Sequence, residues 1–163
     1  MLDRANFHSA SDSQSLSPDP SSPDPIVADA IPAEIADIDD SSLRLANVIA
    51  AGGDDRKAED IVLLNVADVS YLADYFVVMT GFSKVQVRAI ARVVQDNVEE
   101  YCGRLPVHVE GMTDGTWVLL DYGDAIAHIF TPQEREYYNL EAFWGHAKQI
   151  PFVAPQILPD SAD

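Results

Sequence analysis

Cysteine is nearly absent from this chain: Cys102 is the single cysteine in 163 residues. One thiol cannot form an internal disulfide, and it cannot supply the several thiolates of a cysteine-rich zinc site. The sequence therefore excludes a scaffold held together by its own disulfides. This cysteine usage fits a reducing compartment, and we expect a cytoplasmic protein that is stabilised by a hydrophobic core.

Basic residues are also scarce, with ten Lys and Arg against 27 Asp and Glu and a net charge of −17. Contact with phosphates needs a basic face, so this balance argues against direct nucleic-acid binding and against an anionic membrane surface. The aromatic pairs Tyr137-Tyr138 and Phe143-Trp144 are accordingly predicted to be core anchors rather than a base-stacking platform. A basic protein is the easier partner for such a chain.

Long apolar runs are missing as well. A helix that crosses a bilayer needs about 20 consecutive apolar residues, and no stretch of the sequence approaches this length. The N-terminus lacks the apolar core of a signal peptide, and its acidity is unlike the arginine-rich composition of an organelle transit peptide. We therefore expect no membrane association and neither of these targeting segments.

Composition divides the chain into three parts. Residues 1–40 are rich in Ser, Pro and Asp and carry one arginine against nine carboxylates, a net charge of −8. Such a segment buries too little apolar surface to offset the entropy of ordering, so we predict a disordered acidic extension. Residues 41–150 are predicted to form one domain, and the proline-containing residues 151–163 a flexible tail.

Alternating helix and strand signals predict an α/β fold. A serine-capped helix is predicted at 41–51, ending at Gly52-Gly53, and a second helix should run from a Ser83–Gln86 capping box to about Cys102. Runs of apolar, β-branched and aromatic residues predict the strands. The result is a single domain with a mixed five-stranded sheet and helices packed on it, with strands at 60–66, 73–81 and 106–111, two more within 115–130, and further helical turns from Pro132 and at 140–145.

The stretch GTWVLLDYGDAIAHIF at 115–130 predicts a hairpin whose tight turn is centred on Gly123-Asp124. In this register Leu119 faces His128. Side chains alternate along a strand, so one face collects a mostly aliphatic set for the core, namely Val118, Leu120, Tyr122, Ala125, Ala127 and Ile129. The opposite face mixes aromatic rings with a carboxylate and an imidazole, as partner-binding patches do; it holds Trp117, Leu119, Asp121, Ile126, His128 and Phe130.

The residues Asp121, Asp124 and His128 also raise the question of a metal site. In the predicted register Asp121 and His128 lie one diagonal step apart, about 7–8 Å between backbones, and Asp124 projects from the turn. A zinc site needs three or four ligands at roughly 2 Å, so we predict no metal here. Two interpretations stay open: the carboxylates cap the turn beside a semi-buried histidine, or the group belongs to a partner-binding surface.

The stretch GFSKVQVR at 81–88 resembles a glycine-serine turn that holds a phosphate at a helix N-terminus. A nucleotidyltransferase would pair this turn with an Asp-x-Asp on the next strand to hold magnesium, but that strand reads VHVEG with Glu110 alone. Ser83 is better explained as a helix cap. Cys102 has no evident base beside it and no Gly-x-Ser-x-Gly turn occurs, so no catalytic nucleophile is predicted.

Four motifs follow one another between Ser42 and Gln149: DYFVVMTGFSKVQVRAIA, VEG, WVLLDYGDAIAHIF and REYYNLEAFWG. In their order and spacing they closely resemble the ribosomal silencing factor family, also called RsfS or Iojap. The resemblance implies a nucleotidyltransferase-like topology without the catalytic acids of those enzymes. It therefore implies a protein that is not an enzyme and that uses no cofactor.

The resemblance also implies a function. Family members bind the universal large-subunit ribosomal protein fourteen on the face that joins the small subunit, and so block subunit association and repress translation when nutrients are limiting. Carried over to this chain, the partner-contact residues are Trp117, Asp121, Tyr122, Gly123, Asp124 and His128. A family-like homodimer is compatible with the resemblance. The alternative is a divergent nucleotidyltransferase-fold protein that binds or transfers nucleotides.

Overall fold

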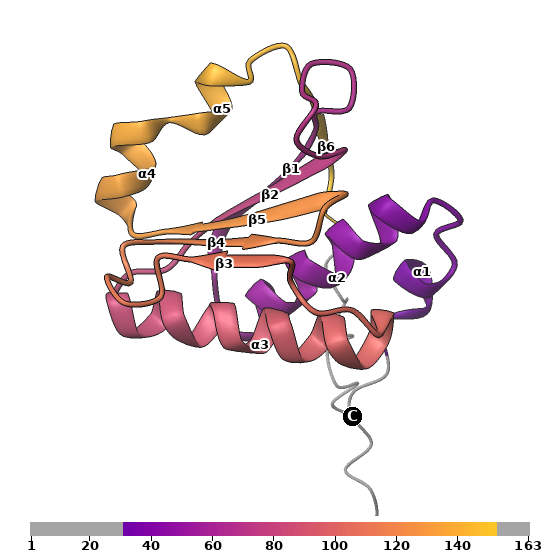
Figure 1. Cartoon of the computed structure of the whole chain (residues 1–163), viewed down its shortest axis with the longest axis horizontal. Helices are drawn as coiled ribbons and strands as arrows, with labels where there is room; N and C mark the ends of the chain where they lie inside the picture. Colours follow the sequence, from indigo (N-terminus) through magenta and orange to yellow (C-terminus); the bar gives the residue numbers. More distant parts are fainter. Residues whose placement is uncertain (1–30, 153–163) are drawn as a thin grey trace, which may run out of the picture. The chain divides into compact units, whose positions relative to one another are not determined.

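The computed structural model describes residues 31–152 (Figure 1), so the disorder predicted for residues 1–30 and most of the predicted tail lie outside the described residues. The α/β class is confirmed. In chain order the elements are α1 (Ala33–Ala36), α2 (Ser41–Asp55), β1 (Glu59–Asn65), β2 (Tyr75–Thr80), α3 (Lys84–Cys102), β3 (His108–Glu110), β4 (Trp117–Asp121), β5 (Ala125–Phe130), α4 (Pro132–Tyr138), α5 (Leu140–Phe143) and β6 (Lys148–Ile150).

One mixed sheet runs through the domain in the strand order β3-β4-β5-β2-β1-β6. β2 and β5 are parallel, and the other neighbouring strands are antiparallel. The mixed sheet is confirmed, but the prediction of five strands is wrong, because β6 pairs with β1 and places Ile150 opposite Leu63. β6 has three residues and no strand-length apolar run, so the sequence carries no local signal for it. The nucleotidyltransferase-like topology stays a prediction.

Helices lie over both faces of this sheet, α2 and α3 over one and α4 and α5 over the other (Figure 1). The α2–α3 face buries the main core, which contains all six residues of the predicted core face of the hairpin. Burying one such aliphatic side chain contributes about 1.5–3 kcal/mol, so this face fixes the hairpin in the fold.

A second, smaller core lies on the face of α4 and α5. Phe76, Ile126 and Phe130 are buried there, and Trp117 and Trp144 pack against them. On the side of the hairpin predicted to face a partner, the β5 residues Ile126, His128 and Phe130 are therefore covered by the protein itself, whereas Trp117, Leu119 and Asp121 of β4 are half-buried. The reason is that α4 and α5 fold back over β5, an arrangement that the alternation within the hairpin does not encode.

The first predicted helix does not end at Gly52-Gly53 but continues through both glycines to Asp55. Both glycines are buried in tight contacts. A Cβ on Gly52 would lie 3.0 Å from the Cα of Val94 in α3, and a Cβ on Gly53 would lie 2.5 Å from the Sδ of Met79 in β2. The two glycines therefore mark a close approach to neighbouring elements rather than a helix end.

The second predicted helix is confirmed as α3, with the predicted cap. The Ser83 hydroxyl accepts the N–H of Gln86 at 3.0 Å, and the Gln86 side chain accepts the N–H of Phe82 at 2.7 Å. Gly103 ends the helix in the left-handed conformation, with φ of +63°. No helix within residues 31–152 is both long and apolar enough to cross a membrane.

The ordered domain begins before residue 41. Ile35 of α1 is fully buried in the main core, and Ile31 and Ile38 pack against that core. For residues 31–40 the predicted disorder is therefore wrong. Three isoleucines at a spacing of three to four residues dock this segment, and the polar average composition of the extension hides them.

Candidate functional site

The candidate site is built on the β4–β5 hairpin, whose observed register is the predicted one, with Leu119 opposite His128. At its tip the N–H of Tyr122 donates to the carbonyl of Ala125 at 2.9 Å. Gly123 has φ of +92°, a conformation that residues with a Cβ rarely adopt. The turn glycine and the alternation of apolar residues thus specify this register together.

Asp121 belongs to the turn. Its Oδ1 accepts the backbone N–H of Gly123 at 2.8 Å, as in an Asx turn. The Asp121 side chain stays half-buried at the sheet surface, and Gly123 is exposed. The capping interpretation therefore holds for Asp121, and it leaves this carboxylate partly accessible to a partner.

The half-buried Asp124 is bound by other side chains of the protein. Its carboxylate forms an ion pair with Arg104 at 2.8 Å and accepts the hydroxyl of Ser42 at 3.0 Å. Burial by itself would raise the pKa of Asp124, but the hydrogen bonds from Arg104 and Ser42 hold it below its ordinary value. Arg104 also donates to the carbonyl of Tyr122. Asp124 therefore ties the hairpin tip to the start of α2 and to the chain that leads into β3.

Tyr122 is fully buried in the main core. Burial raises the pKa of its phenol well above the ordinary value, so the side chain stays neutral. In this conformation the phenol does not reach the surface, and its place among the contacts that the resemblance implied stays a prediction. Strand alternation explains this position, since Tyr122 follows Val118 and Leu120 on the core face.

His128 is buried beneath Trp117. Its Nδ1 accepts the indole N–H of Trp117 at 3.2 Å, which places the proton of the neutral imidazole on Nε2. Burial lowers the pKa of His128 to about 4, against a smaller opposing effect of Asp121, so the ring is neutral at physiological pH. His128 is therefore not exposed, and its hydrogen bond helps to orient the indole of Trp117.

Trp117 is half-buried, and aromatic rings surround its indole. The ring centroids lie 4.9 Å from Phe130, 4.6 Å from Tyr138 of α4 and 5.9 Å from His128. Such aromatic pairs contribute about 0.5–1.5 kcal/mol each beyond the area that they bury. The indole thus has a fixed orientation while part of it remains open to solvent.

Two tyrosines extend the exposed area beside Trp117. Tyr137 is 80% exposed and packs edge to face on Tyr138, which in turn contacts Trp117. The prediction that both tyrosines are core anchors is therefore wrong, because a helix of seven residues packs little of its surface on the sheet. We call the set Trp117, Leu119, Asp121, Tyr137 and Tyr138 the Trp117 surface.

The three polar residues of the hairpin do not converge on one point. Asp121 binds the turn, Asp124 binds Arg104 and Ser42, and His128 binds Trp117. Within residues 31–152, no three His, Cys, Asp or Glu side chains are grouped as a metal site requires. Each of the three side chains instead holds a part of the hairpin in place.

A family model described as "Ribosomal silencing factor during starvation" matches residues 39–162. The chain belongs to the RsfS family. The match runs past Pro151, so most of the segment predicted to be a flexible tail lies within the matched region.

Individual relatives agree with this family. The chain is 44% identical over 103 residues to the ribosomal silencing factor RsfS of Bacillus subtilis, covering 63% of this chain and 86% of that protein. It is 38% identical over 117 residues to the chloroplastic protein Iojap of Arabidopsis thaliana, covering 71% of this chain and 48% of that protein. A crystal structure of a Chromobacterium violaceum protein is similar at 33% identity with a TM-score of 0.61, covering 72% and 96% of the two chains.

Proposed function

We propose that this RsfS family member binds the large ribosomal subunit through the Trp117 surface and sterically blocks joining of the small subunit, repressing translation under nutrient limitation. The proposed partner is the universal large-subunit ribosomal protein fourteen. The observation that carries the proposal is the indole of Trp117, which His128 and two further rings hold in place while it stays partly exposed. Blocking an interface needs no reaction, so the protein acts without catalysis and without a cofactor.

The Trp117 surface has the properties of a protein-binding patch. Tryptophan and tyrosine are enriched among the residues that dominate interface energies. Because the orientation of the indole is already fixed, little side-chain entropy is lost when a partner covers it. Leu119 and Tyr137 add apolar area around this anchor, and exposed apolar area of this kind marks binding sites.

Charge supports a basic protein as the partner. The chain carries a net charge of −17, and ribosomal proteins are typically basic. Opposite charges accelerate the encounter of two proteins, and this effect weakens as salt is added. We therefore expect binding that becomes slower at higher ionic strength. The same acidity speaks against recognition of ribosomal RNA by this surface.

We assign two roles within the residues carried over from the family. Trp117, Asp121 and Gly123 are the proposed contacts, since each is at least partly accessible. Tyr122 and His128 are proposed supports, since both are buried. Asp124 is a proposed support because its carboxylate is bound by Arg104 and Ser42. A role at cytoplasmic ribosomes would agree with the predicted cytoplasmic location.

The test is binding of a Trp117→Ala variant to purified large subunits in a sedimentation assay. Loss of an interface anchor costs about 2 kcal/mol or more, which corresponds to at least roughly thirtyfold weaker binding. Trp117→Phe should be intermediate, because it keeps the stacked ring and loses the indole N–H. Tyr71→Ala is the control, as it removes an exposed aromatic ring from the loop between β1 and β2.

A second readout tests the block itself. Addition of the wild-type chain to joined ribosomes should move the equilibrium towards free subunits, as seen in a sucrose gradient. A wild-type chain that neither sediments with large subunits nor separates joined ribosomes would refute the proposed function. Circular dichroism of each variant verifies that the fold is retained.

A further inference from the structure

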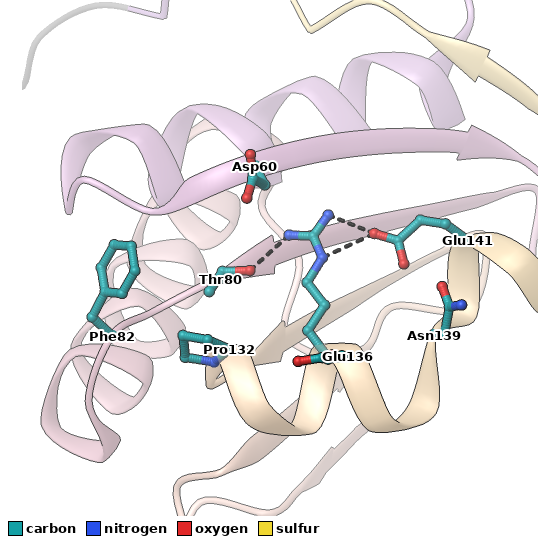
Figure 2. A pocket seen from close by; sticks show the side chains of 8 residues that line it. Asp60, Thr80, Phe82, Pro132, Glu136, Asn139 and Glu141 are labelled. Carbon is teal, nitrogen blue, oxygen red and sulfur yellow. Dashed lines mark hydrogen bonds and ion pairs between the residues drawn. The ribbon is translucent and has the colours of Figure 1, made fainter.

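A cavity of about 480 Å³ lies between the ends of β1 and β2, the turn before α3, and helix α4 (Figure 2). This size is within the range of small-ligand sites, roughly 300–1,000 Å³. Arg135 is fixed in its wall. Its Nη1 donates to the Thr80 hydroxyl at 2.7 Å, and its Nε and Nη2 donate to Oε1 of Glu141 at 2.9 and 2.5 Å.

The lining of the cavity is negatively charged. It contains the carboxylates of Asp60, Glu136 and Glu141 and the single guanidinium of Arg135, which leaves a net charge of −2. Arg135 is only 13% exposed and is paired with Glu141. Asp60 and Glu136 are exposed, and neither takes part in an ion pair within residues 31–152. Two carboxylates are thus available to a ligand.

An aromatic ring and a backbone irregularity complete the site. Phe82 is 62% exposed and lines the cavity together with Pro132. Asp60 lies in a β-bulge with φ of +49°, and bulges redirect the side chains that they carry. Two carboxylates free of ion pairs and an open phenyl face in one lining fit a cation on an apolar stem, because the ring attracts the charge and the apolar wall covers the stem.

Other ligand classes fit this lining poorly. The turn at 81–83 resembles a phosphate-binding turn, but the Ser83 hydroxyl and the Phe82 N–H are both engaged with Gln86. The lining charge of −2 would repel a nucleotide phosphate. A metal ion is disfavoured because no three metal-ligating side chains are grouped within residues 31–152.

We propose that this cavity receives an arginine or lysine side chain of the bound protein, paired with Asp60 and Glu136 and lying against Phe82. The inference rests on the proposed function for the identity of that protein. Helix α4 lies between the two areas, since its residue Glu136 lines the cavity and the ring of its residue Tyr138 packs on Trp117 with ring centroids 4.6 Å apart. A partner that covers the Trp117 surface and extends across α4 would reach the cavity.

The test compares two double variants with the same net charge. Asp60→Asn with Glu136→Gln neutralises the cavity, and asparagine tolerates the left-handed backbone of position 60. Glu99→Gln with Glu100→Gln removes two exposed charges from the far end of α3. We expect roughly tenfold or greater weakening of large-subunit binding for the cavity variant, as for hydrogen bonds to charged groups, and less than about threefold for the control.

Equal affinities of the two double variants would overturn the proposal and leave the proposed function intact. If the wild-type chain does not bind large subunits, the proposed function fails and a second experiment decides the cavity. In it, N-acetyl-arginine methylamide is titrated into the labelled chain and followed by NMR. Shifts at Thr80 and Phe82 that the neutral citrulline analogue does not cause would support the site, and their absence up to the solubility of the probe would refute it.

Discussion

The buried imidazole of His128 predicts a specific loss of stability in mild acid. His128 is 6% exposed, and burial lowers its pKa to about 4, whereas a histidine in an unfolded chain titrates near about 6.5. As the pH falls, the unfolded chain therefore takes up this proton before the folded chain does. The stability that depends on a neutral His128 is complete above about pH 7.5 and is lost between there and about pH 4.

The two pKa values set the size of the effect. Proton linkage gives a loss of about 2 kcal/mol between pH 7.5 and pH 5.0, and about 3 kcal/mol once the pH is below about 4. Carboxylates of this acidic chain also titrate in that interval. The quantity to compare is therefore the stability difference between the wild type and His128→Asn, which does not titrate and whose amide oxygen can still accept the N–H of Trp117.

The measurement is urea unfolding at both pH values, followed by far-ultraviolet circular dichroism. The free-energy advantage of the wild type over His128→Asn should shrink by about 2 kcal/mol between pH 7.5 and pH 5.0. His146→Asn is the matched control, because the side chain of His146 is exposed to solvent in the folded chain as well as in the unfolded chain. An advantage that is the same at both pH values would show that the folded chain protonates His128 as readily as the unfolded chain, which contradicts a buried neutral ring.

Two further predictions concern stability. Gly111 has φ of +86°, and a Cβ there would lie 1.9 Å from the carbonyl oxygen of Trp117, so Gly111→Ala should lose about 3 kcal/mol or more in thermal unfolding. Gly103→Ala, at φ of +63° with no atom near the new Cβ, should lose only about 1 kcal/mol. Asp124→Asn should lose about 1 kcal/mol in urea unfolding, since its partner Arg104 is 40% exposed, and should bind large subunits unchanged. Weaker binding at unchanged stability would place Asp124 in the contact instead.

The hairpin shows what the sequence can predict. Leu120 and Ile129 fall on one face for any register that keeps a two-residue turn, and the glycine at position 123 favours that turn. Both signals are local, and the observed pairing agrees with them. These local signals do not show that other elements cover the opposite face of the hairpin. The covering helix α4 is only seven residues long, and its tyrosines do not reveal which side of the helix packs on the sheet.

Contacts between distant segments account for the other differences. Gly52 and Gly53 look like a helix end in sequence, but their missing side chains make room for Val94 and Met79. Strand β6 exists because β1 offers it an edge. In each case the deciding partner lies 26 or more residues away along the chain, where no pattern within one element can show it.

A motif that identifies a binding family does not by itself identify the atoms that touch the partner. In this hairpin Trp117 and Asp121 are the proposed contacts, whereas Asp124 binds Arg104 and Ser42 and the buried His128 binds the indole of Trp117. Substitutions of these residues would therefore act by different routes. A lost contact lowers affinity in a chain of unchanged stability, whereas a lost support lowers stability, or affinity through a displaced indole. Unfolding and sedimentation measured on the same variants therefore separate the two roles, which a binding assay alone would merge.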